Sequence, residues 1–597
     1  MANRVNISRY LPLSLAALAL LGGLLLVLSS FLAYPSLKAV LDPMAQDGSL
    51  EIFTRSLHQQ LIPILRWSGL ALIGIGVVCL LFRDALGSWS SRLVQSIAAY
   101  SLRDDLRQVL RALRPPADEH FFLIFLAGIT LLAAIIRGLS LFAPMLHDEA
   151  YTYIAFASRP LRYVLSDYHL PNNHIFHTLL VFISTRLLGN HPWAVRLPAY
   201  LAGVLTVPAA YQVGKLAYDK STGLIAAALV AASGALINYS TNARGYALIA
   251  FFFMISLIIG DYVRRRSSPI GWVVLILVST LGFYTIPIML YPFGIVMTWL
   301  FLSWFGKDVH PTQGWAFMGW LALSGLAVIL FTSLLYSPVI LIGSGWDSLA
   351  GNNFVASLGW GNLLESLPGR ARSAWGLWMD AVPSIAIMIT VIGFFGSLAL
   401  HRRISTQRAP VQIAAVLWIA AALAIQRVAP LARVWLFLLP IYLVWSAAGW
   451  VGLFHLLPVR INVAQGYRLA ALLAIAIPAV QLYVTAAEFK WPIENPGLEE
   501  QIAVYLEDHL QPGDTVVADA PLRAMLEYYF SAYGISRDYF YQEETSSQRA
   551  WVVVGEQYGQ SLEGILEREG LGREVSLESK QFVESFDRAT LYRFEFR

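Results

Sequence analysis

The stretch FFLIFLAGITLLAAIIRGLSLFAPMLHDEAYTYIAF, residues 121–156, decides the fold class of this 597-residue chain. Its first part, 121–143, is almost entirely apolar and is long enough to cross a hydrocarbon core of ~30 Å as a helix. It then continues into His147, Asp148 and Glu149. We therefore expect a membrane-spanning helix that places acidic side chains at the membrane surface.

The same apolar pattern recurs along the chain. Hydrophobic residues make up 57% of the sequence and charged residues 13%, which argues against a soluble globular protein. The runs predict a polytopic α-helical membrane protein with about thirteen spans, near 11–33, 63–82, 121–143, 195–216, 222–238, 245–262, 270–287, 288–305, 315–337, 383–400, 411–427, 433–454 and 468–487.

The numbers and positions of cysteine and arginine limit the remaining classes of protein. Cys79 is the single cysteine, so an intramolecular disulfide and a cysteine metal cluster are excluded. Arg4 and Arg9 precede an apolar run that is too long for a signal peptide, so we expect a retained anchor. The net charge of +4 is small. The arginines cluster beside spans, so they indicate which side of the membrane each loop lies on rather than a nucleic-acid-binding surface.

The arginine clusters also predict the orientation. Short cytoplasmic loops carry the excess of Lys and Arg, so the N-terminus and the basic segment 83–116 are placed inside. The span 121–143 then exits and leaves the acids outside. The apolar stretch 172–189 is interpreted as an interfacial helix, because a crossing there would put the clusters at 264–266 and 401–403 outside.

Three domains follow from these patterns. Residues 1–119 hold two spans and a basic amphipathic segment, 120–487 form the membrane domain with external loops 144–194 and 337–383, and 488–597 form an extracytoplasmic α/β domain. In that last domain we expect helices and strands in alternation, with helices at 498–510, 525–533 and 561–570 and strands at 515–520, 550–556 and 589–597.

The outer acids suggest chemistry at the membrane surface. Asp148 suits a general base that takes a proton from an acceptor hydroxyl, with Glu149 beside it and His147 as a possible substrate-binding group. The alternative is structural, because Asp148 is also a good candidate for the N-cap of the following helix.

Arginines on the same predicted face would complete such a site. Arg196, Arg244 and Arg433 each lie at the edge of a span near an external turn, and guanidinium groups bind phosphate through a bidentate fork. The alternative is that each side chain extends to lipid headgroups.

Histidines and tryptophans leave two further questions open. His174 and His177 are one helical turn apart, which fits either a shared metal or, as we prefer, a polar helix face. His174 and Tyr246 are possible substrate-binding residues, and a divalent metal is not supported. Tryptophans of the large loop either stack on a sugar or line the membrane interface, namely Trp346, Trp360, Trp375 and Trp378.

The order of these residues resembles a known family. Asp148-Glu149 after a span, a helix beginning near PNNH (171–174), and then VRLP (195–198) and ARGYAL (243–248) resemble the GT-C membrane glycosyltransferases. The nearest branch is the glycosyltransferase family 39-like group, with bacterial relatives of protein O-mannosyltransferases and of the lipid A aminoarabinose transferase. The likeness covers about residues 120–450.

The resemblance implies a GT-C fold and a transferase that uses a sugar linked to a polyprenyl phosphate. It implies Asp148 as the catalytic acid/base and Arg196 and Arg433 as groups at the donor phosphate. Two departures stand out: Pro171-Asn172-Asn173-His174 replaces the His-Pro-Pro or Lys-Pro-Pro of those branches, and no acid follows the turn at 244–247.

The expected function is therefore sugar transfer from a polyprenyl-phosphate donor to a hydroxyl of a glycan, lipid or protein, at the outer face of a cell membrane, most simply a bacterial inner membrane. No cofactor and no nucleic-acid partner are expected. A transporter or lipid flippase is the main alternative, although transporters usually place ionisable residues near the midplane. An inactive scaffold and a ligase of lipid-linked glycans are the others.

Overall fold

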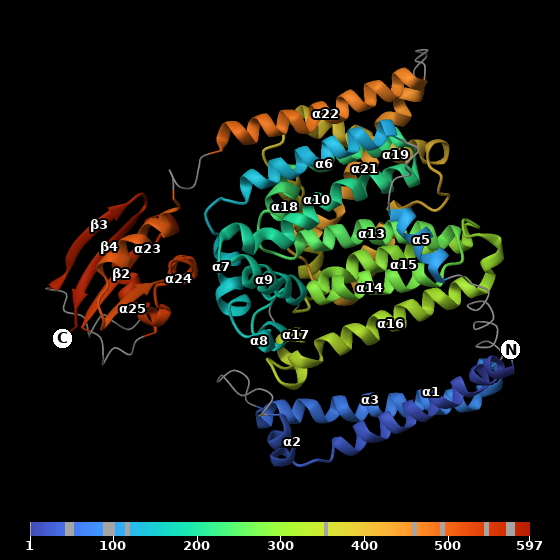
Figure 1. Cartoon of the computed structure of the whole chain (residues 1–597), viewed down its shortest axis with the longest axis horizontal. Helices are drawn as coiled ribbons and strands as arrows, with labels where there is room; N and C mark the ends of the chain where they lie inside the picture. The colour runs from blue at the N-terminus through green and yellow to red at the C-terminus, as the bar shows by residue number, and fades with distance from the viewer. Residues whose placement is uncertain are drawn as a thin grey trace.

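The computed structural model is a long helical bundle with a small α/β domain at one end (Figure 1). The structure describes residues 2–41, 53–87, 102–113, 120–351, 356–456, 463–489, 496–541, 548–568 and 579–596. The basic segment predicted over 83–116 lies partly outside these residues.

The helical part begins with α1 and ends with α22. Its elements are α1 (Ala2–Ser29), α2 (Tyr34–Leu41), α3 (Arg55–Leu81), α5 (Leu102–Leu113), α6 (His120–Ser140), α7 (His147–Thr152), η2 (Tyr153–Ala157), α8 (Leu161–Ser166), α9 (Ile175–Leu188), α10 (Pro192–Ala217), α11 (Lys220–Ala232), α12 (Gly234–Ser240), α13 (Tyr246–Arg265), α14 (Pro269–Thr285), η3 (Pro287–Met289), α15 (Leu290–Phe305), η4 (Pro311–Gln313), α16 (Gly314–Leu341), α17 (Trp346–Ala350), α18 (Trp360–Trp378), α19 (Ser384–Ile404), α20 (Val411–Gln426), η5 (Ala432–Phe437), α21 (Leu438–Leu456) and α22 (Val463–Glu488).

Each predicted span coincides with a helix of this bundle, except that 222–238 covers the two helices α11 and α12. Among the described residues, nine helices are long and apolar enough to cross a membrane, or ten if the bent pair α11–α12 is one span. The other predicted spans correspond to shorter apolar helices, including α14 and α20. The polytopic α-helical fold class is confirmed, and the number of crossings stays a prediction.

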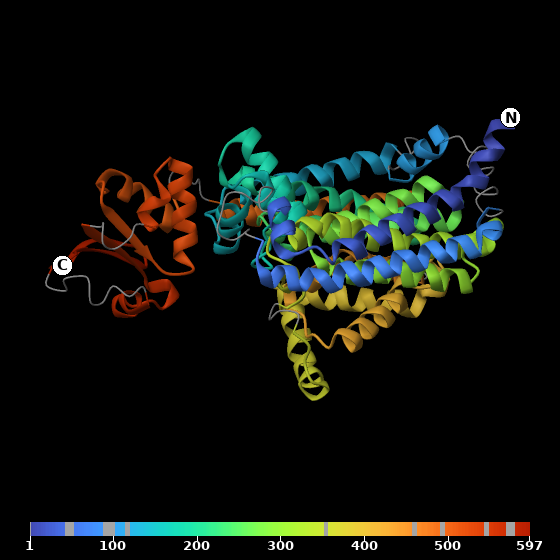
Figure 2. The same cartoon turned by 90° about the horizontal axis from the view of Figure 1, so that it is seen from below.

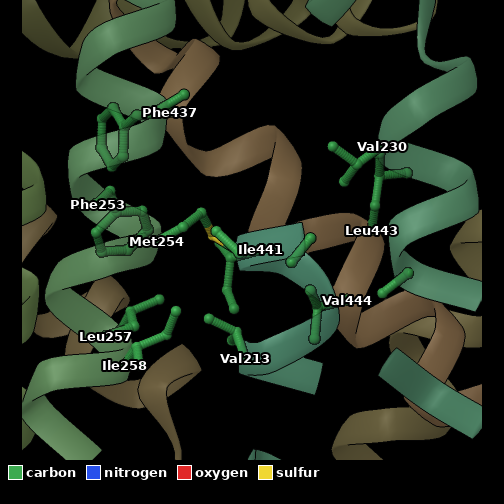
Figure 3. Close-up of a cluster of buried hydrophobic side chains, with 14 of the residues drawn as sticks. Val213, Val230, Phe253, Met254, Leu257, Ile258, Phe437, Ile441, Leu443 and Val444 are labelled. Carbon is green, nitrogen blue, oxygen red and sulfur yellow. The ribbon is translucent and has the colours of Figure 1, made fainter. Parts of the chain in front are cut away.

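The centre of the bundle is a continuous apolar core. Figure 3 shows Val213 of α10 and Val230 of α11 facing side chains of α13, η5 and α21. Phe253 of α13 meets Phe437 of η5 edge to face, with 5.4 Å between the ring centroids, a favourable arrangement for aromatic pairs. This packing fixes α13 and η5, which lead to the site described below.

Loops predicted to be cytoplasmic meet at the end of the bundle away from the α/β domain. The Arg266 side chain donates to Gln108 in α5 at 2.5 Å, the amide of Arg408 donates to Asp308 at 2.6 Å, and the amide of Thr406 donates to Ala217 at 2.9 Å. The arginine-rich turns therefore share one end, as expected from the charge pattern, and the acidic loop lies at the other (Figure 1).

The helix α9 begins and ends on the same side of the bundle. His174, just before α9, accepts a hydrogen bond from the amide of Gly245 at 2.9 Å. Asn190, just after it, donates to Ser531 of the α/β domain at 3.4 Å. The stretch 172–189 therefore does not run from one end of the bundle to the other, which fits the interpretation as an interfacial helix.

A 62° bend separates α11 from α12. The break exposes carbonyls that have lost their helical partners. The buried Arg137 of α6 donates to two of them, Ala231 at 3.0 Å and Val230 at 3.1 Å, and to the hydroxyl of Ser240 at 3.0 Å. This arginine fixes the direction in which α12 enters the turn before α13.

The C-terminal domain contains a four-stranded sheet of order β1-β2-β4-β3, in which β1 and β2 are parallel and the other pairs antiparallel. The six predicted elements are present, and β3 was not predicted because its alternation is short and charged. The elements are α23 (Leu498–His509), β1 (Asp514–Ala518), α24 (Leu522–Tyr533), η6 (Arg537–Phe540), β2 (Arg549–Gly555), η8 (Glu556–Tyr558), α25 (Leu562–Arg568), β3 (Gln581–Phe586) and β4 (Ala589–Glu595).

The expected external loop 337–383 contains more helix than its sequence suggested. The helix α18 occupies much of it, and Figure 2 shows it as the yellow helix that projects from the side of the bundle. Only Leu363 and Ala374 of its side chains are buried. Glycines and a proline inside the helix hid it, since both residue types disfavour helix interiors.

Candidate active site at the end of the bundle

The acids lie on α7, a two-turn element that follows α6. The helix begins at His147 with Leu146 as its N-cap residue, so the structure corrects the expectation that Asp148 might be the N-cap. The cap function belongs to Glu149 instead, whose Oε1 accepts the amide of Leu146 at 2.8 Å. Acids in a first helical turn are also favoured by the helix dipole.

Glu149 and Arg196 form a fully buried ion pair. Glu149 is 0% exposed and Arg196 1%, and the guanidinium contacts both carboxylate oxygens. Arg196 also donates to the carbonyls of Leu141 at 2.7 Å and Pro144 at 2.8 Å, and Glu149 Oε2 accepts the amide of Ala243 at 3.0 Å. The pair thus ties the loop after α6 to α10 and to the turn before α13.

Asp148 points to a different side of α7 and keeps access to solvent. Its side chain is 44% exposed, and its Oδ2 lies 2.7 Å from Arg244 Nη1 and 3.6 Å from Arg433 Nη1. Arg244 is nearly buried at 4% and Arg433 is 34% exposed. Both of these distances are to Oδ2. Two cations around one anion leave an excess positive charge.

Asn172 holds the carboxylate-bearing turn and one of the arginines together. Its amide nitrogen donates to the carbonyl of Asp148 at 3.2 Å and to the hydroxyl of Thr152 at 3.3 Å. Its amide oxygen accepts from Arg244. Asn172 was noted in the sequence only as part of the PNNH stretch (171–174), and its distance in sequence from Arg244 conceals the contact.

His174 and Tyr246 form the wall behind Arg244. The His174 ring meets the Tyr246 ring edge to face at 5.3 Å between centroids, and the Arg244 guanidinium lies over the Tyr246 ring at 5.8 Å. Burial, together with Arg244, His177 and Arg433, lowers the pKa of His174 well below its ordinary value. A neutral ring is also required for Nδ1 to accept the Gly245 amide.

His147 points toward the α/β domain. Its Nδ1 lies 2.9 Å from the carbonyl oxygen of Pro521, and because a carbonyl only accepts, Nδ1 is the donor. The structure thus brings together Asp148, Arg244 and Arg433, with His174 and Tyr246 behind them, while Glu149 and Arg196 form a separate buried pair.

The described residues contain no group of three His, Cys, Asp or Glu side chains that could hold a metal ion. His177 is fully buried behind His174, and neither of its ring nitrogens has a hydrogen-bond partner among the described residues.

Comparisons with known proteins concern the family and the fold of the chain. The sequence model of the family described as dolichyl-phosphate-mannose-protein mannosyltransferase matches residues 173–336. The solved structure of ArnT from Cupriavidus metallidurans bound to undecaprenyl phosphate is similar with a TM-score of 0.50 and 14% identity, over 80% of this chain and 98% of that chain. This chain has the GT-C fold.

Other GT-C structures show a weaker likeness. The apo form of ArnT from the same organism gives a TM-score of 0.42 at 13% identity, over 80% of this chain and 98% of that one. The archaeal oligosaccharyltransferase AglB from Archaeoglobus fulgidus, in complex with an inhibitory peptide and a dolichol-phosphate, gives 0.46 at 13% identity, over 74% and 70%. A sequence search of curated proteins found no match.

Proposed function

We propose that this GT-C chain is a membrane glycosyltransferase that moves a sugar from a polyprenyl-phosphate donor to an acceptor hydroxyl at the outer face of the membrane. The observation that carries the proposal is the partly exposed Asp148 carboxylate between Arg244 and Arg433. It combines a base with cations suited to phosphate. The match to the mannosyltransferase family and the undecaprenyl phosphate of the similar structure support the same donor class.

The reaction follows from these charges. The acceptor oxygen attacks the anomeric carbon and passes its proton to Asp148, and the bond from that carbon to the phosphate oxygen breaks. The electron pair leaves on the polyprenyl phosphate, whose developing charge Arg244 and Arg433 stabilise. The 44% exposure of the Asp148 side chain leaves the carboxylate accessible to the acceptor hydroxyl.

Glu149 and Arg196 have a different part in this proposal. Their hydrogen bonds to each other and to backbone groups leave the guanidinium of Arg196 buried. The contacts therefore favour a positioning role over the phosphate contact expected for Arg196 from the sequence. The pair fixes the position of α7 relative to the turn that carries Arg244.

The test is sugar transfer by the purified chain in lipid, with a panel of polyprenyl-phosphate monosaccharides as donors and membrane extract as acceptor. Asp148→Asn is expected to lower release of polyprenyl phosphate by about 10²–10⁴-fold, the usual contribution of a general base. Arg433→Gln is expected to raise the donor KM.

An exposed arginine away from the site, as in Arg186→Gln, provides the matched control and should leave turnover unchanged. Undiminished release in Asp148→Asn would refute the base assignment. If no donor is consumed by the folded chain, while a fluorescent polyprenyl phosphate crosses the bilayer faster, the chain is a flippase instead.

A further inference from the structure

A second candidate site lies between the membrane domain and the α/β domain. A cavity of about 800 Å³ is bounded on one side by His147, Tyr151 and His169 and on the other by α24 and η6. Ligand sites typically enclose about 300–1,000 Å³. We propose that this cavity binds the saccharide portion of the acceptor, an inference that rests on the proposed function.

The geometry of α7 connects the cavity to the base. His147 and Tyr151 are one turn apart and both line the cavity. Asp148 follows His147 by one residue, which turns its side chain by about 100° around the helix axis. Asp148 does not line the cavity itself, so an acceptor whose saccharide binds there has to extend past His147 to bring a hydroxyl to the carboxylate.

The charges of the lining argue for a neutral ligand. Three arginines are balanced by three acids, namely Arg159, Arg523, Arg537, Asp519, Glu527 and Asp538. Arg523 is paired with Glu527 at 3.1 Å, and Glu527 also accepts from the Tyr541 hydroxyl at 2.8 Å. A net cationic pocket would favour a phosphate, and an apolar one a lipid chain. This lining fits neither.

Such a lining suits hydroxyl groups. A sugar hydroxyl both donates and accepts, so it can sit between a guanidinium and a carboxylate. Arg537 adds a guanidinium with no hydrogen-bond or ion-pair partner among the described residues. The rings of Tyr151 and Tyr541 supply flat apolar faces of the kind that pack on sugar rings.

A fixed hydrogen-bond chain orients Tyr151. His169 lies between Asp167 and Tyr151, with Nδ1 2.6 Å from Asp167 Oδ1 and Nε2 3.0 Å from the Tyr151 hydroxyl. Burial raises the pKa of Asp167, but its hydrogen bonds from His169 outweigh burial and the pKa is lowered. The Asp167 carboxylate accepts from Nδ1 of His169, and the contact of Nε2 with the Tyr151 hydroxyl fixes the position of the phenol at the cavity.

The test is binding to the full chain in nanodiscs, with the donor absent. The probes are defined neutral oligosaccharides of hexoses and N-acetylhexosamines, a serine- and threonine-rich peptide, and inorganic phosphate. We expect one or more oligosaccharides to bind, and Tyr151→Phe and Arg537→Gln to weaken that binding about three- to tenfold, as loss of single hydrogen bonds does. Glu563→Gln on α25 lies outside the cavity lining and is the matched control.

Several outcomes would overturn the proposal: no oligosaccharide binds, binding is unchanged in both cavity variants, or the variants weaken only peptide or only phosphate binding. The result is separable from the proposed function, because Asp148→Asn should abolish transfer yet keep oligosaccharide binding. Transfer that survives in Asp148→Asn, with cavity-dependent binding, would reject the base and keep the cavity.

Discussion

Asp148 and Glu149 are neighbours in sequence and differ completely in environment. One carboxylate is 44% exposed between two arginines, and the other is fully buried against Arg196. Neighbouring residues of a helix point about 100° apart, which suffices to place one in the site and the other in the support behind it. The sequence indicated an important acid pair, but it held no signal for which member was buried.

The buried member should matter for stability. Glu149→Gln leaves the Arg196 charge without a counter-ion, and we expect it to lower the free energy of unfolding by about 3–5 kcal/mol. The measurement is thermal unfolding in lipid. Asp148→Asn is the matched control, since it is the same kind of change one residue away on a carboxylate that is 44% exposed, and it should destabilise the chain less than Glu149→Gln does. Equal stability of the two variants would contradict the assignment.

His174 predicts a pH effect on stability. Its pKa in the folded chain is lowered well below 6.5, so below about pH 6.5 the unfolded chain binds a proton that the folded chain does not. Stability should therefore fall as the pH drops below that value. His174→Asn keeps an acceptor for the Gly245 amide and should flatten the dependence between pH 7 and 5. The control His310→Asn changes an exposed histidine and should leave the pH dependence as it is. Equal slopes of stability against pH in the unchanged chain and both variants would refute the prediction.

At the scale of elements, the site depends on connections between helices. Arg244 reaches Asp148 because α12 bends away from α11, and the bend is stabilised by Arg137 of α6. The sequence predicted one span over 222–238, since hydropathy does not report a break. Arg137 was not singled out, because a lone arginine near the end of a span is ordinary and its partners are carbonyls about 90 residues away.

Removing that arginine should loosen the bend. Arg137→Met fills much of the same space but leaves the carbonyls of Val230 and Ala231 unsatisfied, at a cost of about 1–3 kcal/mol each. We expect a lower unfolding temperature, and a higher donor KM because Arg244 is less well positioned. Arg186→Met on the exposed side of α9 is the control. Unchanged KM with lower stability would show that the bend does not position the site.

For the whole molecule, the α/β domain packs directly against the helix that carries Asp148. Helix α24 lies against α7 (Figure 1), where the Tyr529 hydroxyl accepts the amide of Met145 at 3.2 Å and the Tyr528 ring meets Tyr153 edge to face. The composition change near residue 488 predicted a separate domain and most of its elements. It could not predict the docking, which depends on tyrosines that look like ordinary core residues of an amphipathic helix.

Removing one hydroxyl oxygen should weaken the packing of the α/β domain against α7. Tyr529→Phe leaves the Met145 amide unsatisfied and should speed hydrogen exchange in residues 141–153, with turnover lowered about fivefold for a loss of ~1 kcal/mol. Tyr533→Phe on the same helix is the matched control, since its hydroxyl bonds Glu500 within the domain. Equal exchange in both variants would show that this contact does not hold the domain in place.

The site residues Asp148, Asn172, Arg244 and Arg433 lie in the short elements α7 and η5 and in turns at one end of the bundle, and the long helices contribute none of them. A scaffold and a reactive surface encoded by separate segments can diverge at different rates. In evolutionary terms, a descendant of this chain could acquire a new acceptor through changes in a few turns and in the attached domain. The packing of the long helices would not have to change.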